Sequence, residues 1–247
     1  MLAVIYQTFD RPELCANAVR TVEAALCSYD HVSVLANDGA PATFWPKYDT
    51  IAARLDAHVF NGDKERQGPG WTLNEAYQWA ATEGAAWCLH VQDDFYVAEP
   101  GLATGIEGAI LAIEYCPEVR LIRMRVPRAY DLGHAWDEEL AWCESDEVEF
   151  LKAHPSGIVF RRFETYEAGK EHGLTGPSYQ WTDQPHVRPM SAWLDEPYSE
   201  KPIHINRLEW YMNEKFVKRG WRAGYLVPGW FKATVAPSSK DAAGAAK

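Results

Sequence analysis

Hydrophobic positions in the first half of the chain follow two periods in turn. Short apolar runs alternate with longer segments in which apolar side chains recur every three or four residues, as at Leu14, Ala18, Val22 and Leu26. The first pattern is typical of buried strands and the second of amphipathic helices. Their alternation predicts a mostly parallel sheet flanked by helices. The predicted strands are Leu2–Gln7, His31–Ala36, Ala57–Phe60 and Trp87–Val91, and the predicted helices are Pro12–Ser28, Tyr48–Leu55 and Gly70–Ala81.

The second half of the chain has a less regular pattern. Val119–Val126 and Ile158–Arg162 are predicted strands, and Arg207–Arg219 is a predicted helix. Between Tyr130 and Phe150 the sequence has eight acidic residues and no Lys or Arg, which favours a solvated insertion. Residues 238–247 are small and polar and predict a disordered tail outside the fold. The expected fold class is α/β with an irregular second half.

The composition indicates a globular protein. The 247 residues are 47% hydrophobic, which is enough for a large core. A formal charge of −11 disfavours long-range attraction to nucleic acid or anionic membranes, although a local basic patch could override it. The five cysteines are scattered, so neither a disulfide framework nor a zinc site is predicted. No apolar run approaches the roughly 20 residues of a membrane span. A soluble cytoplasmic protein is therefore expected.

Polar residues follow three of the predicted strands. Thr8–Arg11 follows the first, Asn37–Gly39 the second, and Gln92–Asp94 the fourth. In an open parallel sheet, ligands bind beyond the carboxyl ends of the strands, so these segments are expected to share one site. The adjacent carboxylates of Asp93 and Asp94 repel each other unless a cation neutralises them, and oxygen ligands favour Mg²⁺ or Mn²⁺. Alternatively, the two aspartates simply cap a loop or the next helix.

These segments resemble, in order, the signatures of one enzyme family. Thr8–Glu13, Asn37–Gly39, Asn61-Gly62 with Gly68–Asn74, and Gln92–Asp94 are similar to those of nucleotide-sugar glycosyltransferases of the GT-A fold, above all the inverting family 2. The resemblance covers about residues 2–101 and 204–231. It implies a Rossmann-like sheet, a nucleotide-sugar-binding half (1–101), and an acceptor-binding and catalytic half (102–237) of the same domain. The implied activity is sugar transfer from a nucleoside-diphosphate sugar, expected to be a UDP-sugar, to an acceptor hydroxyl.

The resemblance also implies a nucleoside-binding set of four residues. Base and ribose would be contacted by Thr8, Asp10, Arg11 and Asp38. A carboxylate suits ribose hydroxyls because it only accepts hydrogen bonds. In the alternative interpretation, Asp10 or Arg11 caps the following helix and Asn37–Gly39 is an ordinary turn.

The diphosphate and the metal ion would lie beside two further segments. Gly68 and Asn74 bound a stretch expected to run under the diphosphate, where glycine permits close approach and a helix start favours anions; it could equally be a helix-entry turn. Gln92–Asp94 stands where the family carries its Asp-x-Asp motif, with neutral Gln92 as a departure. Asp94 is the expected Mn²⁺ or Mg²⁺ ligand, and Asp93 would contact ribose or a metal-bound water.

Near the C-terminus, relatives of this kind often supply a histidine metal ligand. Gly229–Thr234 contains none. His204 is the candidate substitute ligand, although a lone histidine is more often structural. Alternatively, Lys232 neutralises the diphosphate without a metal ion.

The expected catalytic base is Glu209, in a helix that resembles the family segment carrying that base. Leu208 replaces the acid that usually precedes it. An inverting transfer needs a base within hydrogen-bond reach of the acceptor hydroxyl. Glu209 could instead be an exposed acid paired with Arg207 or Lys215, and Glu214 and Asp183 are weaker candidates for the base.

The acceptor is expected to be a saccharide or a modified base in DNA. Aromatic side chains stack on sugars and bases alike, and several tryptophans lie in the second half of the chain. A group of arginines in the same half forms a basic zone. These arginines would suit a phosphate-bearing acceptor, or they would form ion pairs with the acidic segment between Tyr130 and Phe150. Two rival functions are a metal-dependent nucleotidyltransferase of similar fold and a non-catalytic carbohydrate-binding protein. The tryptophans are Trp136, Trp142, Trp181, Trp193 and Trp210, and the arginines are Arg120, Arg123, Arg125, Arg128, Arg161 and Arg162.

Overall fold

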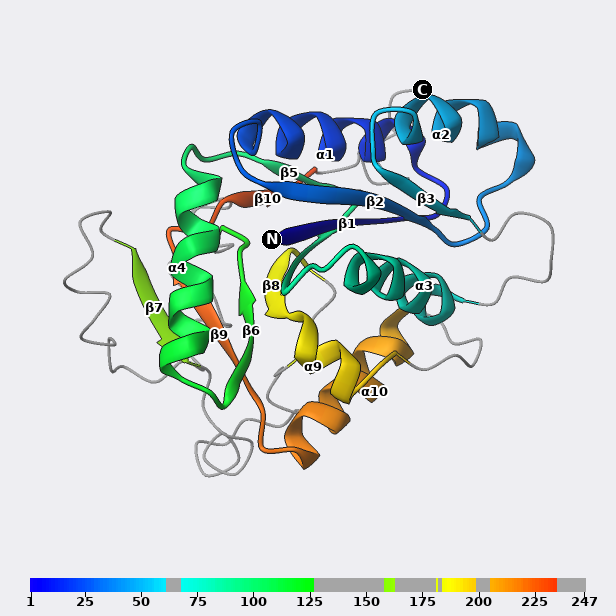
Figure 1. Cartoon of the computed structure of the whole chain (residues 1–247). Coiled ribbons are helices and arrows are strands. Elements are labelled where there is room, and N and C mark those ends of the chain that lie inside the picture. The colour runs from blue at the N-terminus through cyan, green and yellow to red at the C-terminus, as the bar shows by residue number, and fades with distance from the viewer. Residues whose placement is uncertain (61–67, 127–157, 163–180, 182–183, 199–204, 235–247) are drawn as a thin grey trace, which may run out of the picture.

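The computed structural model describes residues 1–60, 68–126, 158–162, 181, 184–198 and 205–234. They form an eight-stranded sheet with helices on both faces and a separate two-stranded ribbon (Figure 1). The strand order in the large sheet is β3-β2-β1-β4-β8-β6-β9-β7, and the ribbon pairs β10 with β5. The strands are β1 (Leu2–Thr8), β2 (His31–Asn37), β3 (Ala57–Phe60), β4 (Trp87–Gln92), β5 (Phe95–Val97), β6 (Val119–Arg123), β7 (Val159–Arg162), β8 (His186–Pro189), β9 (Arg222–Val227) and β10 (Phe231–Ala233).

The two halves of the chain meet inside this sheet. The first half contributes the parallel strands β3, β2, β1 and β4. Strand β8 then pairs antiparallel with both β4 and β6, so it joins the regular half to the irregular one. Strand β9 is parallel to β6 and antiparallel to β7. The expected α/β fold with a Rossmann-like first half is therefore confirmed.

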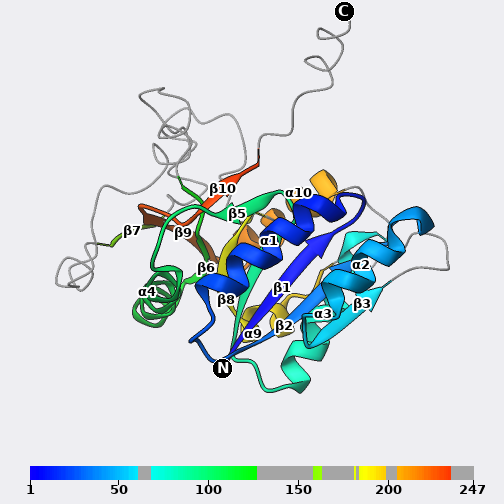
Figure 2. The same cartoon turned by 90° about the horizontal axis from the view of Figure 1, so that it is seen from above.

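Helices cover both faces because strand side chains alternate. Leu2, Val4 and Tyr6 of β1 point to the core beneath α1, α2 and α4, whereas Ala3 and Ile5 point to the core beneath α3, α9 and α10. Figure 1 shows α1 and α2 on one side of β1 and β2 and α3 on the other, and Figure 2 looks down onto α1 and α2. The helices are α1 (Pro12–Ala25), α2 (Trp45–Ala52) with a preceding 3-10 turn (Ala42–Phe44), α3 (Pro69–Thr82), α4 (Leu102–Tyr115), α9 (Met190–Asp195) and α10 (Ile205–Lys218).

Several predicted boundaries were wrong. Helix α1 ends at Ala25, three residues before the predicted end, because Leu26 leaves the helical conformation. Helix α2 begins at Trp45, since Pro46 suits a first turn. The strand predicted over Val119–Val126 ends at Arg123, and Arg125 forms only an isolated bridge to Phe231. Helix α4 was not predicted.

Two arginines at and just beyond the end of β6 are buried rather than exposed as a basic patch. Arg123 is 2% exposed and Arg125 is 5% exposed, and the guanidinium of Arg125 lies 5.9 Å from the centre of the Phe95 ring. Arg162 donates to Glu118 over 2.9 Å. The expectation of a basic zone for phosphate is therefore wrong for Arg123 and Arg125, and for Arg162 it stays a prediction. Arg128 lies outside the described residues.

Of the five tryptophans considered for the acceptor, two belong to the core. Trp181 is fully buried and Trp193 is 5% exposed, whereas Trp210 is 56% exposed. Trp136 and Trp142 lie outside the described residues, as do the acidic segment and the predicted tail.

A polar layer lies in the core between β4, β8 and helix α3. The rings of His90 and His186 stack with centroids 4.9 Å apart, and both residues are fully buried. His90 Nε2 lies 2.8 Å from Gln7 Oε1, and His186 Nδ1 donates to the Gln184 carbonyl over 2.7 Å. Burial and the nearby Arg188 lower the pKa of His90 to about 3. Burial, with His90 and Arg188, also lowers the pKa of His186 well below its ordinary value.

The part of the chain that the structure describes contains no helix of the length and apolar character needed to cross a membrane.

Candidate active site

The predicted strand-end residues do come together. Strands β2, β1 and β4 are adjacent and parallel, so their carboxyl ends lie at one edge of the sheet. The backbone N–H of Asp38 donates to the Thr8 carbonyl over 3.0 Å, and that of Asp93 donates to the Gln7 carbonyl over 3.0 Å. These bonds continue the strand pairing by one step and fix both aspartates beside β1.

Asp93 points inward and is held by a short chain of hydrogen bonds. Its Oδ2 accepts from Thr8 Oγ1 over 2.9 Å, and Thr8 Oγ1 also lies 2.9 Å from the Tyr48 hydroxyl. The Asp93 side chain is 2% exposed. Burial raises the pKa of Asp93 to about 6, against the opposing effects of Arg11 and Thr8. Burial also raises the pKa of Tyr48, so its hydroxyl keeps its proton.

Arg11 bridges the two carboxylates. Its Nη2 lies 2.5 Å from Asp93 Oδ1, and its Nη1 donates to Asp94 Oδ2 over 3.1 Å. Burial disfavours the guanidinium charge, but attraction to Asp93 and Asp94 outweighs it and raises the pKa of Arg11. Arg11 occupies the N-cap position of α1 without a side-chain capping bond. The geometry thus favours a site role for Arg11 over the helix-cap alternative.

The C-terminal ribbon closes over the loop that carries Asp94. Strand β10 pairs antiparallel with β5, and the N–H of Thr234 donates to the Asp94 carbonyl over 2.6 Å. Phe95 and Phe231 of the ribbon face the core. Lys232 pairs with Tyr96 in the ribbon, and because side chains alternate along strands these two residues face away from Phe95 and Phe231. Lys232 Nζ lies 3.7 Å from Glu99 Oε1.

Asp94 has an oxygen suited to a hard cation. Its side chain is 30% exposed, yet its Oδ1 atom is buried and has no hydrogen-bond partner among the described residues. Buried polar atoms are normally paired, so this oxygen fits a ligand position for Mg²⁺ or Mn²⁺. No group of three or more His, Cys, Asp or Glu side chains suited to a metal ion occurs within the described ranges.

The start of α3 lies beside Asp38. Thr72 Oγ1 donates to Asp38 Oδ1 over 3.4 Å, and Asp38 is 3% exposed. Gly68 is the N-cap of α3 and has a φ of +89°, a conformation that favours glycine. Residues 61–67, which include Asn61-Gly62, lie outside the described residues.

The Asn74 side chain connects separate parts of the core through three hydrogen bonds. Its Nδ2 donates to the Tyr198 carbonyl over 3.0 Å. Its Oδ1 accepts from Trp193 Nε1 over 3.0 Å and from the Tyr198 N–H over 2.9 Å. These bonds connect α3 to α9 and to the segment that follows it. The expected contact between Asn74 and the diphosphate stays a prediction, and the described contacts give this amide a structural role.

Glu209 lies in α10, between fully buried Leu208 and exposed Trp210, and is itself half-buried. Helix α10 packs on the face of the sheet opposite to α1. Its role as the base stays a prediction. His204 and Asp183 lie outside the described residues.

Two participants were not singled out in the sequence, although Thr72 lies inside the stretch Gly68–Asn74 expected at the diphosphate. Tyr48 and Thr72 contact Thr8 and Asp38 from helices on opposite faces of the sheet. Both look like ordinary helical residues in the sequence, and neither carries a local signal. They were found only because tertiary packing brings α2 and α3 to the same edge.

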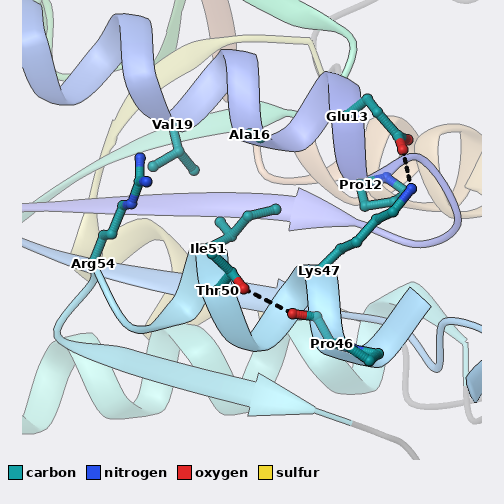
Figure 3. A pocket seen from close by; sticks show the side chains of 9 residues that line it. All are labelled: Pro12, Glu13, Ala16, Val19, Pro46, Lys47, Thr50, Ile51 and Arg54. Carbon is teal, nitrogen blue, oxygen red and sulfur yellow. Dashed lines mark hydrogen bonds and ion pairs between the residues drawn. The ribbon is translucent and has the colours of Figure 1, made fainter. Parts of the chain in front are cut away.

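A groove of about 420 Å³ lies between α1 and α2, next to Arg11 in sequence (Figure 3). Its walls are largely apolar, the Lys47–Glu13 ion pair closes one end, and Arg54 lies at the other. Thr50 donates to the Pro46 carbonyl over 2.9 Å inside the α2 wall. None of the predicted site residues lines this groove. The lining residues are Pro12, Glu13, Ala16, Val19, Pro46, Lys47, Thr50, Ile51 and Arg54.

Comparison with known proteins places this arrangement in a structural context. The sequence matches no protein-family model and no curated protein sequence. The structure is similar to Staphylococcus aureus TarS in complex with UDP, with a TM-score of 0.57, 13% identity, and coverage of 96% of this chain and 61% of TarS 1–349. It is also similar to the mannosyltransferase PcManGT from Pyrobaculum calidifontis in complex with GDP-Man and Mn²⁺, with a TM-score of 0.55, 13% identity, and coverage of 90% of this chain and 53% of that one.

The chain has the GT-A fold. A third similar structure is glucosyl-3-phosphoglycerate synthase from Mycobacterium tuberculosis with Mn²⁺ and UDP-glucose, with a TM-score of 0.50, 11% identity, and coverage of 97% of this chain and 73% of that one. The chain spans about two fifths of the length of full TarS and about three fifths of TarS 1–349. The GT-A resemblance seen in the sequence is thereby confirmed at the level of the fold.

Proposed function

We propose that the protein is a glycosyltransferase that moves a sugar from a nucleoside-diphosphate sugar, a UDP-sugar, to an acceptor hydroxyl. The observation that carries this proposal is the joining of Thr8, Asp38, Asp93 and Asp94 at one sheet edge of a GT-A fold. The similar structures with UDP, GDP-mannose and UDP-glucose support it. In this reading, residues 1–101 bind the donor and residues 102–237 bind the acceptor and carry out the transfer.

The donor is held from three directions. Asp38, fixed beside β1, accepts hydrogen bonds from the ribose, with Thr8 and Asp10 at the nucleoside. The start of α3 at Gly68, with its positive backbone end, faces the diphosphate. The complexes of similar proteins that contain Mn²⁺ support a divalent cation, Mn²⁺ or Mg²⁺, as cofactor. Asp94 would hold it through its unpaired Oδ1 atom, with His204 as a second candidate ligand, and when bound it stabilises charge on the departing diphosphate.

Two side chains complete the proposed chemistry. Lys232, in the strand β10 that pairs with β5 just after Asp94, adds positive charge beside the leaving group. Glu209 takes the proton of the acceptor hydroxyl as it attacks. Asp93 is held by Thr8 and orients the loop that presents Asp94.

A saccharide is the favoured acceptor. Of the arginines that suggested a polynucleotide, Arg123 and Arg125 are buried and Arg162 is paired with Glu118. The exposed Trp210 lies next to Glu209 and offers a flat face of the kind on which sugars stack. A modified base in DNA remains the second acceptor to test. The cytoplasm is the proposed compartment, because the four described cysteines are free thiols.

Donor binding and turnover test the proposal. A UDP-sugar with Mn²⁺ is expected to raise the melting temperature, since a ligand of the native state stabilises it, and UDP is expected to be released. Asp94→Asn should abolish the Mn²⁺-dependent part of the shift. Glu209→Gln should keep the shift and lose at least about a hundredfold in UDP release.

Glu114→Gln, an exposed acid on α4, is the matched control and should behave like the wild type. Tight glycan binding with no UDP release from any donor would favour a non-catalytic carbohydrate-binding protein. Release of pyrophosphate from a nucleoside triphosphate would favour a nucleotidyltransferase. Either result would overturn the proposed activity.

A further inference from the structure

Arg11 already neutralises the carboxylates that a metal ion would use. Its two terminal nitrogens lie 2.5 Å from Asp93 and 3.1 Å from Asp94. The Asp93 side chain has a second partner in Thr8, which donates to its other oxygen. Asp94 has Arg11 on Oδ2 and no described partner on Oδ1. The pair of acids is therefore stable without a metal ion because Arg11 supplies the cation.

A divalent cation at Asp94 would be close to this guanidinium. Metal ions of this kind bind carboxylate oxygen at roughly 2.0–2.1 Å, and Arg11 Nη1 is 3.1 Å from the other oxygen of the same carboxylate. Two cations on one carboxylate repel each other strongly in a partly buried setting. Arg11 and the metal ion must therefore compete for Asp94 whenever no further negative charge is present.

We propose that Arg11 is a built-in counter-ion that keeps divalent cations off Asp94 until the donor arrives. This inference rests on the proposed function, because the donor's diphosphate is the anion that receives Arg11. A guanidinium binds phosphate oxygens through two N–H groups, so the exchange replaces one bidentate ion pair with another. The metal ion and the donor therefore bind together, and each binds weakly alone.

The contacts of Arg11 permit this exchange. Its side chain is 46% exposed, it belongs to the loop just before α1, and it makes no capping bond that would be lost. Asp93 keeps the hydrogen bond from Thr8 when Arg11 leaves. Besides Asp93 and Asp94, the charge that acts on Arg11 is that of Asp10, which also favours the guanidinium.

The proposed coupling between Mn²⁺ binding and donor binding predicts the direction of each change. If Arg11 blocks the metal ion, removing its charge should strengthen Mn²⁺ binding in the absence of nucleotide. The same change should weaken the effect of the donor on Mn²⁺ affinity. Thermodynamic reciprocity requires an equal loss in the effect of Mn²⁺ on donor affinity.

The test is a titration with Mn²⁺ in the absence of nucleotide, in which the electron paramagnetic resonance signal measures the unbound ion. The pH is about 7.5, because Asp93, with a pKa of about 6, is charged there. Arg11→Gln is expected to bind Mn²⁺ about tenfold more tightly than the wild type, or about 1.4 kcal/mol. Arg11→Lys keeps the charge but cannot bind both carboxylates at once, so about a threefold gain is expected. Adding UDP should raise Mn²⁺ affinity strongly in the wild type and little in Arg11→Gln.

The double variant Arg11→Gln with Asp94→Asn is the control, and it should lose the gain. Unchanged or weaker Mn²⁺ binding in folded Arg11→Gln would overturn the inference, as would a gain that survives Asp94→Asn. If Arg11→Gln does not fold, an unchanged affinity in Arg11→Lys overturns it instead. A gain in Arg11→Gln with no response of any variant to UDP or UDP-sugars would refute the proposed donor and leave the competition at Asp94 standing.

Discussion

The stacked pair His90 and His186 should make the protein sensitive to mild acid. Both rings are fully buried and neutral in the folded state, because burial and Arg188 lower the pKa of each. In the unfolded chain each ring returns to its ordinary value of 6.5. The unfolded state therefore binds more protons than the native state below that pH. Stability is complete above about pH 6.5 and falls as the pH drops from there toward the folded pKa.

The magnitude follows from the unfolded pKa alone, as long as the folded rings stay neutral. At about pH 5 each histidine has titrated through about 1.5 pH units, and each unit corresponds to about 1.36 kcal/mol. At about pH 5, one ring thus lowers the free energy of unfolding by about 2 kcal/mol, and the pair lowers it by about 4 kcal/mol. A domain of this kind has roughly 5–15 kcal/mol of stability, so the effect is large enough to measure.

The assay is urea unfolding at about pH 7.5 and at about pH 5, with the difference between the two free energies as the result. His90→Leu and His186→Leu should each reduce the wild-type loss by about 2 kcal/mol, whatever they cost at neutral pH. His31→Gln is the control of opposite sign. The hydrogen bond to Glu23 raises the pKa of His31, so its removal should slightly increase the loss. If His90→Leu loses as much stability on acidification as the wild type, the assignment of neutral buried rings is wrong.

Two further predictions concern single positions in the fold. Asn74→Ala should cost about 2–4 kcal/mol in urea unfolding, because it leaves the Trp193 indole N–H and the Tyr198 backbone buried without partners; Asn74→Asp, which keeps the acceptor oxygen, should cost less. Gly229→Ala should lower the melting temperature much more than Gly101→Ala. Both glycines have positive φ, but a Cβ at Gly229 would lie 2.2 Å from a backbone oxygen, whereas none lies within 4 Å at Gly101. Equal effects of the two alanines would show that the loop simply moves aside.

The parts of the fold that could be predicted from the sequence are those with local periodicity. Strands β1, β3 and β4 and helix α3 were predicted within one residue or so at each end, because one apolar pattern covers each element. Helix α4 was missed because its sequence is apolar or small at most positions, with Gly105 packed against Trp230 and Gly108 near Ile158. The apolar stripe of an amphipathic helix cannot be recognised in a sequence where nearly every position is apolar or small.

Pairing between distant segments was the other limit. Strand β8 is only four residues long, and it is defined by antiparallel partners on both sides rather than by its own pattern. The arginines Arg123 and Arg125 suggested a surface, since nothing in the sequence shows that the sheet continues past β6 on both sides. At the site, the rule that ligands bind beyond the carboxyl ends of parallel strands correctly predicted that Thr8, Asp38 and Asp93 lie together. The bridge made by Arg11 depends on side-chain geometry that no spacing encodes.

The pairing of β10 with β5 has a consequence for how the protein is made. The first strands and α1 and α3 consist of contiguous chain and can assemble while the ribosome is still adding the second half. The Asp94 loop cannot be closed at that stage, because Thr234 is the residue that holds its carbonyl. A nascent chain that has not yet extended past this point carries the acids of the site on an untied loop. The order of synthesis therefore delays closure of the Asp94 loop until almost the whole described chain has emerged.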